Sequence, residues 1–315
     1  MSEFLLPFER MIEALSPPAT VRAIEAGESA DALWSGIAES GFLDALVPEE
    51  RGGAALPLAE VCSLWQALGR HAVPLPVGET MIARALLTDA PEGPVALATA
   101  SGGGETVVPF GGVARHVLLD SGGQLYLVAA EGDPTGVSGS TALRLTPAAA
   151  GNAVAPSPEG GLRAVAAILR AALIAGAAER LTAMTAAYAN ERVQFGKPIG
   201  KQQALQQQMA VMAEDMVSCR IASQLGCAGG LPPSLVAAAT AKSVTSAAAV
   251  RLAATAHAVH GAIGISEEYD LQLYTRRLHE WRLADGSESY WNRKLGAARL
   301  SDSSGSVDYV RSAFA

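Results

Sequence analysis

The sequence predicts a mainly α-helical protein with an N-terminal helical domain over residues 1–91, a reduced β domain over 92–158 and a four-helix bundle over 159–315. Half of the 315 residues are hydrophobic, and much of this apolar content is alanine, especially after residue 161. Alanine is the best helix former. Short β-like runs separated by glycine clusters lie between residues 92 and 158. The length corresponds to about two domains of ordinary size.

The N-terminal part is expected to contain at least two helices. One opens in the segment Ser29–Trp34, and its apolar residues recur at helical spacing: Leu33, Trp34, Ile37 and Ala38. A second helix is expected over Pro57–Gly69, with one apolar face: Leu58, Val61, Leu64, Trp65 and Leu68. Gly69 suits the C-cap of this second helix. Val47–Gly53 is a turn-rich connection between the two.

The middle part is expected to form a small sheet of short strands. Its β-like runs are Val95–Thr99, Thr106–Val108, His116–Leu119 and Gln124–Val128. Glycine clusters at 102–104, 111–112 and 122–123 separate these runs. The cluster at 102–104 lacks the lysine and the following helix of a phosphate-binding loop, so it is interpreted as a turn.

The C-terminal part is expected to form the bundle. Four long helices are predicted there: Leu162–Glu191, Lys201–Gly226, Leu235–Val259 and Leu278–Arg299. Proline and glycine segments separate them: Pro198, Pro232-Pro233 and Gly261–Gly264. Four helices with short connections pack naturally as a bundle.

Charge and cysteine content exclude several classes of function. The formal net charge of −8 disfavours binding to a phosphate backbone, so no nucleic-acid partner is expected. Three scattered cysteines are too few for a disulfide framework, and buried thiols are expected. The N-terminus does not resemble a signal peptide, and no apolar stretch is long enough to insert into a membrane. A cytoplasmic location is therefore expected. His257 and His260 lack an obvious third ligand, so no metal site is predicted.

Four motifs stand in a characteristic order along the chain. They are Trp34…Glu39-Ser-Gly-Phe42 with Val47–Gly53, then Arg192–Ile199 followed by Gln203-Ala204, then His260–Gly264 with Tyr274–Arg277, and finally Asp285–Glu288. In this order they resemble the acyl-CoA dehydrogenase family, over about 250 of the 315 residues. The chain is identified as a shortened member, similar to the smaller subunit of heteromeric acyl-CoA dehydrogenases.

The resemblance implies an FAD-dependent oxidoreductase that dehydrogenates an acyl-CoA thioester at its α and β carbons, in fatty acid or steroid side-chain degradation. It also implies a homo-oligomer, or a hetero-oligomer with a full-length acyl-CoA dehydrogenase subunit, in which FAD is shared across the interface. The residues implied in FAD binding are Arg192, Gln194, Phe195, Gln203, His260, Gly261, Gly286 and Ser287. A guanidinium such as that of Arg192 can clamp a pyrophosphate. The alternative for Arg192 is a surface ion pair with Glu191 or Glu179.

Asp285 stands where the family places its catalytic glutamate, directly before Gly286-Ser287. Aspartate keeps the carboxylate but is one methylene shorter, and a displacement of about 1 Å can cost about 100-fold in rate. Glu288 is the fallback candidate for the base. The alternative for Asp285 is an ordinary loop residue that caps the last helix.

The sequence departs from the family in the middle part, which has only 67 residues. It lacks the Thr-Glu-Pro-Gly-like segment and the Trp-Ile-Thr-like strand that hold the flavin ring in relatives. Ala258 also replaces a glutamine that contacts FAD in many of them. Two alternatives to an independent enzyme therefore stay open. The chain is a cofactor-completing subunit without its own chemistry, or a helical scaffold with no redox role.

Overall fold

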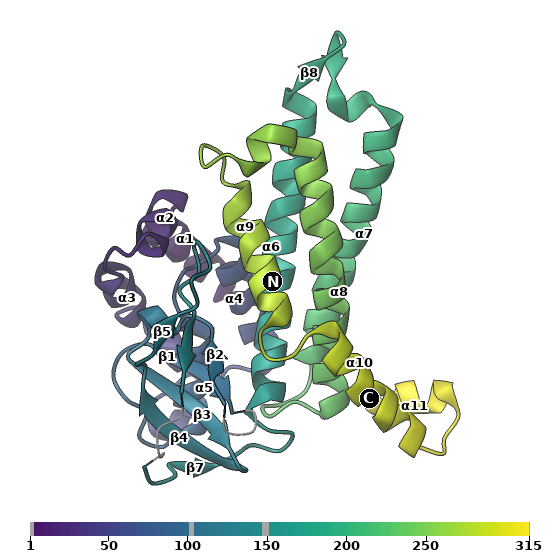
Figure 1. Ribbon diagram of the computed structural model, residues 1–315. Coiled ribbons are helices and arrows are strands. Elements are labelled where there is room, and N and C mark those ends of the chain that lie inside the picture. Colours follow the sequence, from purple (N-terminus) through teal and green to yellow (C-terminus); the bar gives the residue numbers. More distant parts are fainter. Residues whose placement is uncertain (1–2, 101–103, 147–150, 315) are drawn as a thin grey trace.

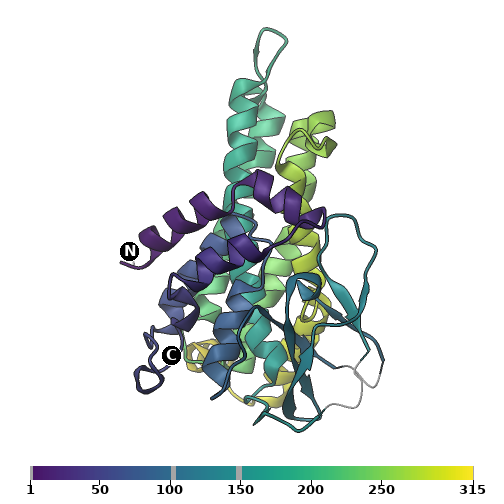
Figure 2. The same cartoon turned by 90° about the vertical axis from the view of Figure 1, so that its left-hand side faces the viewer.

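The protein, a computed structural model describing residues 3–100, 104–146 and 151–314, has a long helical bundle with two small sheets against its lower flank (Figure 1). The N-terminal helices cross the bundle on the same flank, above the sheets (Figure 2). The order of helix, strand and helix along the chain confirms the predicted mainly helical fold. The domain limits at residues 91 and 158 stay a prediction.

Five helices precede the sheets, and they pack on the bundle through a shared apolar core. This region also contains two 3₁₀ helices, η1 (Phe42–Asp44) and η2 (Glu49–Arg51). The helices are α1 (Leu5–Leu15), α2 (Pro18–Glu25), α3 (Asp31–Ala38), α4 (Leu58–Arg70) and α5 (Val77–Leu86). The two predicted N-terminal helices are therefore confirmed as α3 and α4.

The middle part forms two small sheets, and all four predicted strands are confirmed. One sheet has the order β1-β3-β4-β7, with β1 and β3 parallel and the other pairs antiparallel. The other is antiparallel with the order β2-β6-β5. The strands are β1 (Val95–Thr99), β2 (Thr106–Val108), β3 (His116–Ser121), β4 (Gln124–Ala129), β5 (Asp133–Pro134), β6 (Leu143–Leu145) and β7 (Ala155–Pro156). Residues 102–103 of the predicted glycine turn at 102–104 lie outside the described residues.

Alternation along β1 fixes where the two sheets sit. Val95 and Leu97 belong to the main core shared with the helices, whereas Ala96 and Ala98 belong to a second cluster with residues of β2 and β6. Successive strand side chains point to opposite faces, so one strand serves both cores. The β2-β6-β5 sheet therefore packs on the face of β1 that points away from the main core.

The bundle begins with α6, whose limits match the prediction. The helices are α6 (Leu162–Glu191), α7 (Gln203–Gly226), α8 (Leu235–His260), α9 (Leu271–Leu283), α10 (Glu288–Ser301) and α11 (Ser306–Ala313). A two-stranded hairpin, β8 (Val193–Gln194) and β9 (Lys197–Pro198), projects from the top of the bundle (Figure 1). Short 3₁₀ turns are η3 (Gly111–Val113), η4 (Ile199–Lys201) and η5 (Gly261–Ile265). Within the described ranges, no helix has the length and apolar character needed to span a membrane.

The prediction of one last helix over Leu278–Arg299 was wrong, because the chain breaks there. α9 ends at Leu283 and α10 begins at Glu288. Between them Asp285 has φ +56° and Gly286 has φ +101°. Left-handed backbone cannot continue a right-handed helix. The break places a half-buried loop between two helices.

Gly69 was also misinterpreted as a C-cap. It lies inside α4, which continues to Arg70, and the residue after the helix is His71. A Cβ atom on Gly69 would lie 2.0 Å from the Leu173 carbonyl oxygen of α6, and one on Gly176 would lie 1.8 Å from the Gln66 carbonyl oxygen of α4. Both glycines therefore let the α4 and α6 backbones touch.

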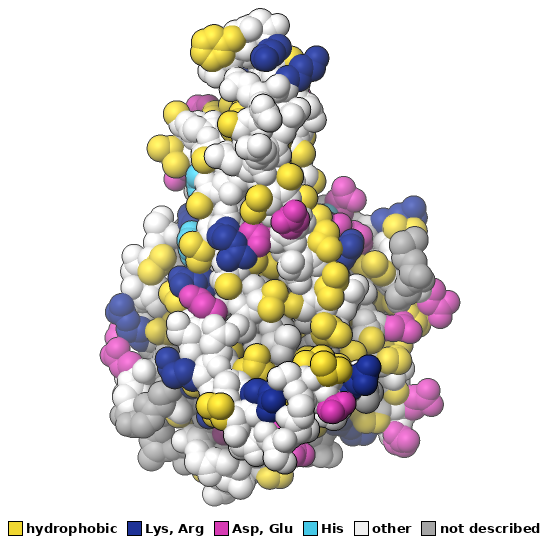
Figure 3. Space-filling view, turned by 90° about the vertical axis from the view of Figure 1, so that its right-hand side faces the viewer, with side chains coloured by type: hydrophobic (Ala, Val, Ile, Leu, Met, Phe, Trp, Pro, Cys, Tyr) yellow, Lys and Arg dark blue, Asp and Glu magenta, His cyan; other side chains and the backbone are white. Residues whose placement is uncertain are grey.

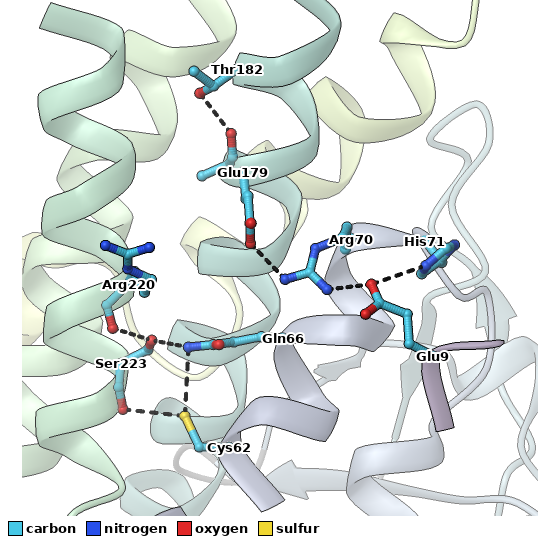
Figure 4. Close-up of polar contacts among 10 residues, drawn as sticks. Glu9, Cys62, Gln66, Arg70, His71, Glu179, Thr182, Arg220 and Ser223 are labelled. Carbon is cyan, nitrogen blue, oxygen red and sulfur yellow. Dashed lines mark hydrogen bonds and ion pairs between the residues drawn. The ribbon is translucent and has the colours of Figure 1, made fainter. Parts of the chain in front are cut away.

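Polar contacts reinforce this junction (Figure 4). Arg70 of α4 pairs with Glu9 of α1 and with Glu179 of α6, the latter at 2.6 Å between Nη2 and Oε2. The Gln66 amide nitrogen donates to Ser223 Oγ of α7 at 2.9 Å. The three cysteines are free and buried, as predicted for Cys219 and Cys227. The N-terminal helices are thus fixed to the bundle by close backbone packing and by ion pairs.

Gly176→Ala should destabilise the protein by about 1–3 kcal/mol, because an added methyl group overpacks the α4–α6 contact. The free energy of unfolding in urea measures this. Gly296→Ala is the matched control, because nothing lies within 4 Å of a Cβ atom at Gly296, inside α10. It should stabilise α10 by up to about 1 kcal/mol. Equal effects of the two substitutions would contradict the close approach.

Candidate active site

The candidate base lies on the loop between α9 and α10. Trp291 Nε1 donates to the Asp285 carbonyl oxygen at 3.0 Å, which holds the loop against α10. A Cβ atom on Gly286 would lie 2.7 Å from the Tyr290 ring and 2.8 Å from Trp291 Nε1. With its φ of +101°, Gly286 is therefore required by both conformation and space. The N-cap of α10 is Ser287, so the capping role considered for Asp285 is wrong.

Arg170 of α6 anchors the carboxylate of Asp285. Its Nε donates to Asp285 Oδ2 at 3.0 Å, and its Nη1 pairs with Glu79 of α5. The side chains of Arg170 and Glu79 are 0% and 1% exposed, and that of Asp285 is 7% exposed. Complete burial raises the pKa of Glu79, and the guanidinium opposes that rise. One cation is thus shared by two carboxylates, each from a different element.

Lys242 of α8 holds the backbone of the same loop. Its Nζ donates to the carbonyl oxygens of Arg282 and Gly286 and to Ser246 Oγ, each at 2.8 Å. Burial lowers the pKa of this amine from 10.5 to about 7, although the charge of Asp285 favours the protonated form. Arg170 and Lys242 therefore approach the loop from two different helices of the bundle.

Asp285 lies at the wall between two cavities. The larger, of about 630 Å³, opens between the β2-β6-β5 sheet and α9. Its surface is mainly apolar, although eight of its lining residues carry polar or charged side chains: Val107, Pro109, Thr135, Val137, Ser138, Gly139, Ser140, Ala142, Arg144, Arg276, His279, Glu280, Leu283, Ala284 and Asp285. The smaller cavity, of about 210 Å³, shares Val107, Leu283 and Asp285 with it. A volume of about 300–1,000 Å³ is typical of a small-molecule pocket.

Phe110 fixes the sheets to the bundle beside these cavities. The guanidinium groups of Arg170 and Arg277 lie 5.7 and 5.1 Å from the centre of its ring. Arg277 also pairs with Glu25 of α2, at 3.0 Å between Nη2 and Oε1. The same cation that anchors Asp285 therefore also contacts the segment that follows β2. The geometry of the pocket depends on both contacts.

Glu288, the fallback candidate, faces another partner. Its carboxylate pairs with Arg282, at 3.1 Å from Nε and 2.5 Å from Nη2. The hydrogen bonds from Arg282 lower the pKa of Glu288. Glu288 does not line either cavity. Among the carboxylates of the loop, Asp285 alone borders the larger cavity.

The residues implied in contacts to the FAD pyrophosphate and adenine lie at the other end of the bundle. Arg192, Gln194 and Phe195 belong to the β8–β9 hairpin and Gln203 opens α7, all exposed. Phe195 is 92% exposed with φ +52°. Figure 3 shows a hydrophobic side chain beside basic ones on this projection. Within the described residues Arg192 forms no ion pair, and Glu179 pairs with Arg70 instead.

The hairpin and the Asp285 loop are far apart in one chain. Arg170, which anchors the loop, and Arg192 are 22 residues apart along α6, or about 33 Å at 1.5 Å per residue. The structure therefore does not bring Arg192 and Gln194 together with Gly286 and Ser287 in one site. It divides the predicted FAD-binding residues between two ends of the bundle.

His260 and Gly261 lie near the hairpin end. The His260 ring is 3% exposed and stacks on Tyr188, with ring centres 4.4 Å apart. Its Nδ1 lies 2.8 Å from the Ala256 carbonyl oxygen. Gly261 is exposed with φ +62°, and Ile265 of the same turn is 77% exposed. The turn itself is open to a ligand or a partner, whereas the histidine ring supports it from inside.

Sequence reasoning missed the buried charges around Asp285. Arg170, Glu79 and Lys242 were not among the candidate site residues. Arg170 and Lys242 each interrupt a long alanine-rich run, which was the available signal. A charged residue inside such a run is buried only if it is paired.

Comparison with known proteins places these features in a family. The sequence profile "Acyl-CoA dehydrogenase, C-terminal domain" matches residues 164–300. The acyl-CoA dehydrogenase IpdE2 of Mycobacterium tuberculosis is 35% identical over 281 residues, which are 83% of this chain and 85% of IpdE2. The chain belongs to the acyl-CoA dehydrogenase family.

Solved structures share the fold. A chain of the ChsE4-ChsE5 complex of Mycobacterium tuberculosis matches with a TM-score of 0.79 and 23% identity, over 97% of this chain and 99% of that one. A chain of the steroid acyl-CoA dehydrogenase Tcur3481-Tcur3483 matches with a TM-score of 0.78 and 24% identity, over 95% and 98%. The reduced middle part is thus compatible with the complete family architecture.

The pKa of Lys242 predicts a pH-dependent contribution to stability. Since this pKa is about 7 in the folded protein and 10.5 in the unfolded chain, the contribution is fully present above pH 10.5 and lost as pH falls toward 7. The free energy of unfolding of the wild type relative to Lys242→Met should rise across this window, by up to about 1.4 kcal/mol per pH unit. Chemical unfolding at several pH values measures it.

Lys201→Met, at an exposed position, is the control for this titration. It removes a lysine without removing a buried amine. A difference between Lys242→Met and the wild type that does not change with pH would show that the Lys242 amine titrates alike in both states.

Proposed function

We propose that this chain is a subunit of an FAD-dependent acyl-CoA dehydrogenase and that Asp285 is its catalytic base. The observation that carries this proposal is the placement of the Asp285 carboxylate. Buried Arg170 holds this carboxylate, and the backbone of Asp285 lies in the left-handed region. The carboxylate borders a cavity of about 630 Å³. A general base must lie within hydrogen-bond reach of the proton that it takes.

The proposed reaction removes a proton and a hydride from neighbouring carbons. The Asp285 carboxylate takes the proton from the α carbon of the thioester, and the electron pair of that bond becomes the new double bond. FAD, when bound, supplies the acceptor for the β hydride. Arg170 fixes Oδ2, and within the described residues no hydrogen bond engages Oδ1. Oδ1 of Asp285 is therefore available to accept the proton from the α carbon.

The larger cavity is proposed to receive the acyl group. Val107, Val137 and Leu283 supply apolar contact, while Ser138, Ser140 and Arg144 supply polar groups. Leu283 is 62% exposed beside Asp285. Apolar walls with a few polar groups are typical of a substrate pocket. They suit an acyl group that carries polar substituents on a hydrocarbon frame.

The hairpin is proposed to complete the FAD site of a neighbouring subunit. Arg192 and Gln194 offer donors that fit a pyrophosphate, and the Phe195 ring offers a surface for stacking. The Phe195 ring is 92% exposed on a projecting hairpin, so its face is free to contact a partner. Since the hairpin is about 33 Å from its own Asp285 anchor, the neighbour's FAD is the ligand it suits.

The neighbour is proposed to be a full-length acyl-CoA dehydrogenase subunit. The middle part of this chain has 67 residues and lacks the segments that hold the flavin ring in relatives. A longer partner supplies those groups. The similarity of fold to a chain of the ChsE4-ChsE5 complex supports a heteromer.

The second candidate is a cofactor-completing subunit without its own chemistry. The ion pair between Arg170 and Asp285 favours it, because a 7% exposed carboxylate paired with a buried cation also serves as a purely structural link. In that case the hairpin would act on the partner's site, and Asp285 would only hold the bundle together.

Substitution of Asp285 separates the two candidates. Asp285→Asn should lower kcat by about 100-fold or more with any accepted acyl-CoA, because it removes the base and keeps the shape. The assay is dye reduction by the chain co-expressed with a full-length family subunit and supplied with FAD. Asp285→Glu is the matched variant that retains a carboxylate. Wild-type rates for Asp285→Asn would favour the cofactor-completing subunit.

The hairpin is tested by flavin retention. The double substitution Arg192→Ala and Phe195→Ala should reduce the visible flavin absorbance that remains with the complex after desalting, while its Tm without flavin stays unchanged. Leu300→Ala is the control, since Leu300 is 89% exposed on α10, outside the hairpin. Full retention by the hairpin variant would contradict its role at the cofactor.

A further inference from the structure

Lys242 is a buried charged residue whose contacts converge on the loop between α9 and α10. Its side chain is 0% exposed and lies in an alanine-rich stretch of α8. It donates to the carbonyl oxygens of Arg282 and Gly286 at 2.8 Å. These two residues flank Leu283, Ala284 and Asp285. The amine therefore bridges the two sides of the break that carries the proposed base.

Each of the two carbonyl groups needs a donor at this place. Arg282 lies in the last turn of α9, where carbonyl groups have no partner within the helix. The C-terminal end of a helix also carries partial negative charge, which favours a nearby cation. Gly286 belongs to the loop itself and has no helical partner. One ammonium group satisfies both, and Ser246 Oγ takes its third hydrogen bond.

The backbone of Asp285 needs such support. Its φ of +56° lies in the left-handed region, which disfavours residues with a Cβ atom. A conformation of this kind persists only where surrounding contacts determine it. Trp291 holds the Asp285 carbonyl oxygen and Arg170 holds the carboxylate. Neither of them bonds to the backbone both before and after Asp285, as Lys242 does through the carbonyl oxygens of Arg282 and Gly286.

We propose that Lys242 is a positioning residue that fixes the backbone of the Asp285 loop and thereby aims the carboxylate at the substrate. This inference rests on the proposed function, in which Asp285 is the base. A methionine would fill a similar volume in α8 without the cost of burying an amine. The lowered pKa of Lys242 reflects that cost. The hydrogen bonds from the Lys242 amine to the Arg282 and Gly286 carbonyl oxygens stabilise the loop.

Hydrogen exchange of the full chain tests the structural half of the inference. In Lys242→Met, amides of the segment 284–288 should exchange about tenfold faster than in the wild type, while amides of α6 keep their rates. Ser243→Ala is the matched control, because Ser243 bonds to Asn292 of α10 and not to the loop. It should exchange like the wild type in 284–288. Unchanged exchange of the segment in Lys242→Met would overturn the proposal.

A second variant distinguishes a local effect on the loop from a general loss of stability. Lys242→Gln keeps one donor group and should give an exchange rate between those of the wild type and Lys242→Met. Faster exchange in α6 and in the loop alike, for both variants, would show that Lys242 supports the whole bundle. That outcome would also overturn the proposal.

Kinetics test the functional half in the complex with FAD. Lys242→Met should lower kcat by about 100-fold with little change in KM, because the base is displaced while the cavity is intact. Combined with Asp285→Asn, it should cause no further loss, because Lys242 acts through Asp285. Additive losses would overturn the positioning role. If the wild type dehydrogenates no acyl-CoA, the proposed function fails, and the exchange comparison decides the role of Lys242.

Discussion

The guanidinium of Arg170 forms ion pairs with two carboxylates, Glu79 and Asp285, from parts of the chain that are distant in sequence. Glu79 belongs to the N-terminal helices and Asp285 to the loop after α9, while Arg170 itself lies on the first helix of the bundle. All three side chains are almost fully buried, where removing one partner of an ion pair leaves an uncompensated charge. The relative placement of the N-terminal helices, the bundle and the loop therefore depends on this contact. Phe110 extends it to the sheets, since its ring lies against the same guanidinium.

The two proposed sites lie at opposite ends of the molecule, and α6 connects them. The end near the sheets carries the cavities and the Asp285 loop, whereas the opposite end carries the hairpin with its exposed aromatic ring (Figure 1). A rigid helix keeps the two ends apart, so a single chain does not close one site with both. This separation gives a physical reason for the proposed oligomer, in which each subunit completes the cofactor site of another.

Close packing and buried charge play opposite roles in the bundle. Gly69 and Gly176 bring α4 and α6 into backbone contact, which leaves no room for side chains between them. Arg170 and Lys242 interrupt the same kind of alanine-rich surface with groups that are costly to bury. Both charges point to the break between α9 and α10. The burial of these two charged groups costs free energy of folding, and their hydrogen bonds fix the geometry of the loop.

The sequence by itself determined the classes of structure. Alanine-rich runs predicted the limits of α6, and short alternating runs predicted β1 to β4, because helix propensity and periodicity are local properties. The motif order indicated the family and drew attention to Asp285. It also grouped the predicted FAD-binding residues without showing that they lie at two ends. Only the tertiary structure decided that these residues lie at two ends of the bundle. It also decided that Gly69 is a packing residue, that Asp285 breaks a helix, and that Arg170 pairs with residues 91 and 115 positions away. Partners so distant in sequence are chosen by packing, which no local pattern records.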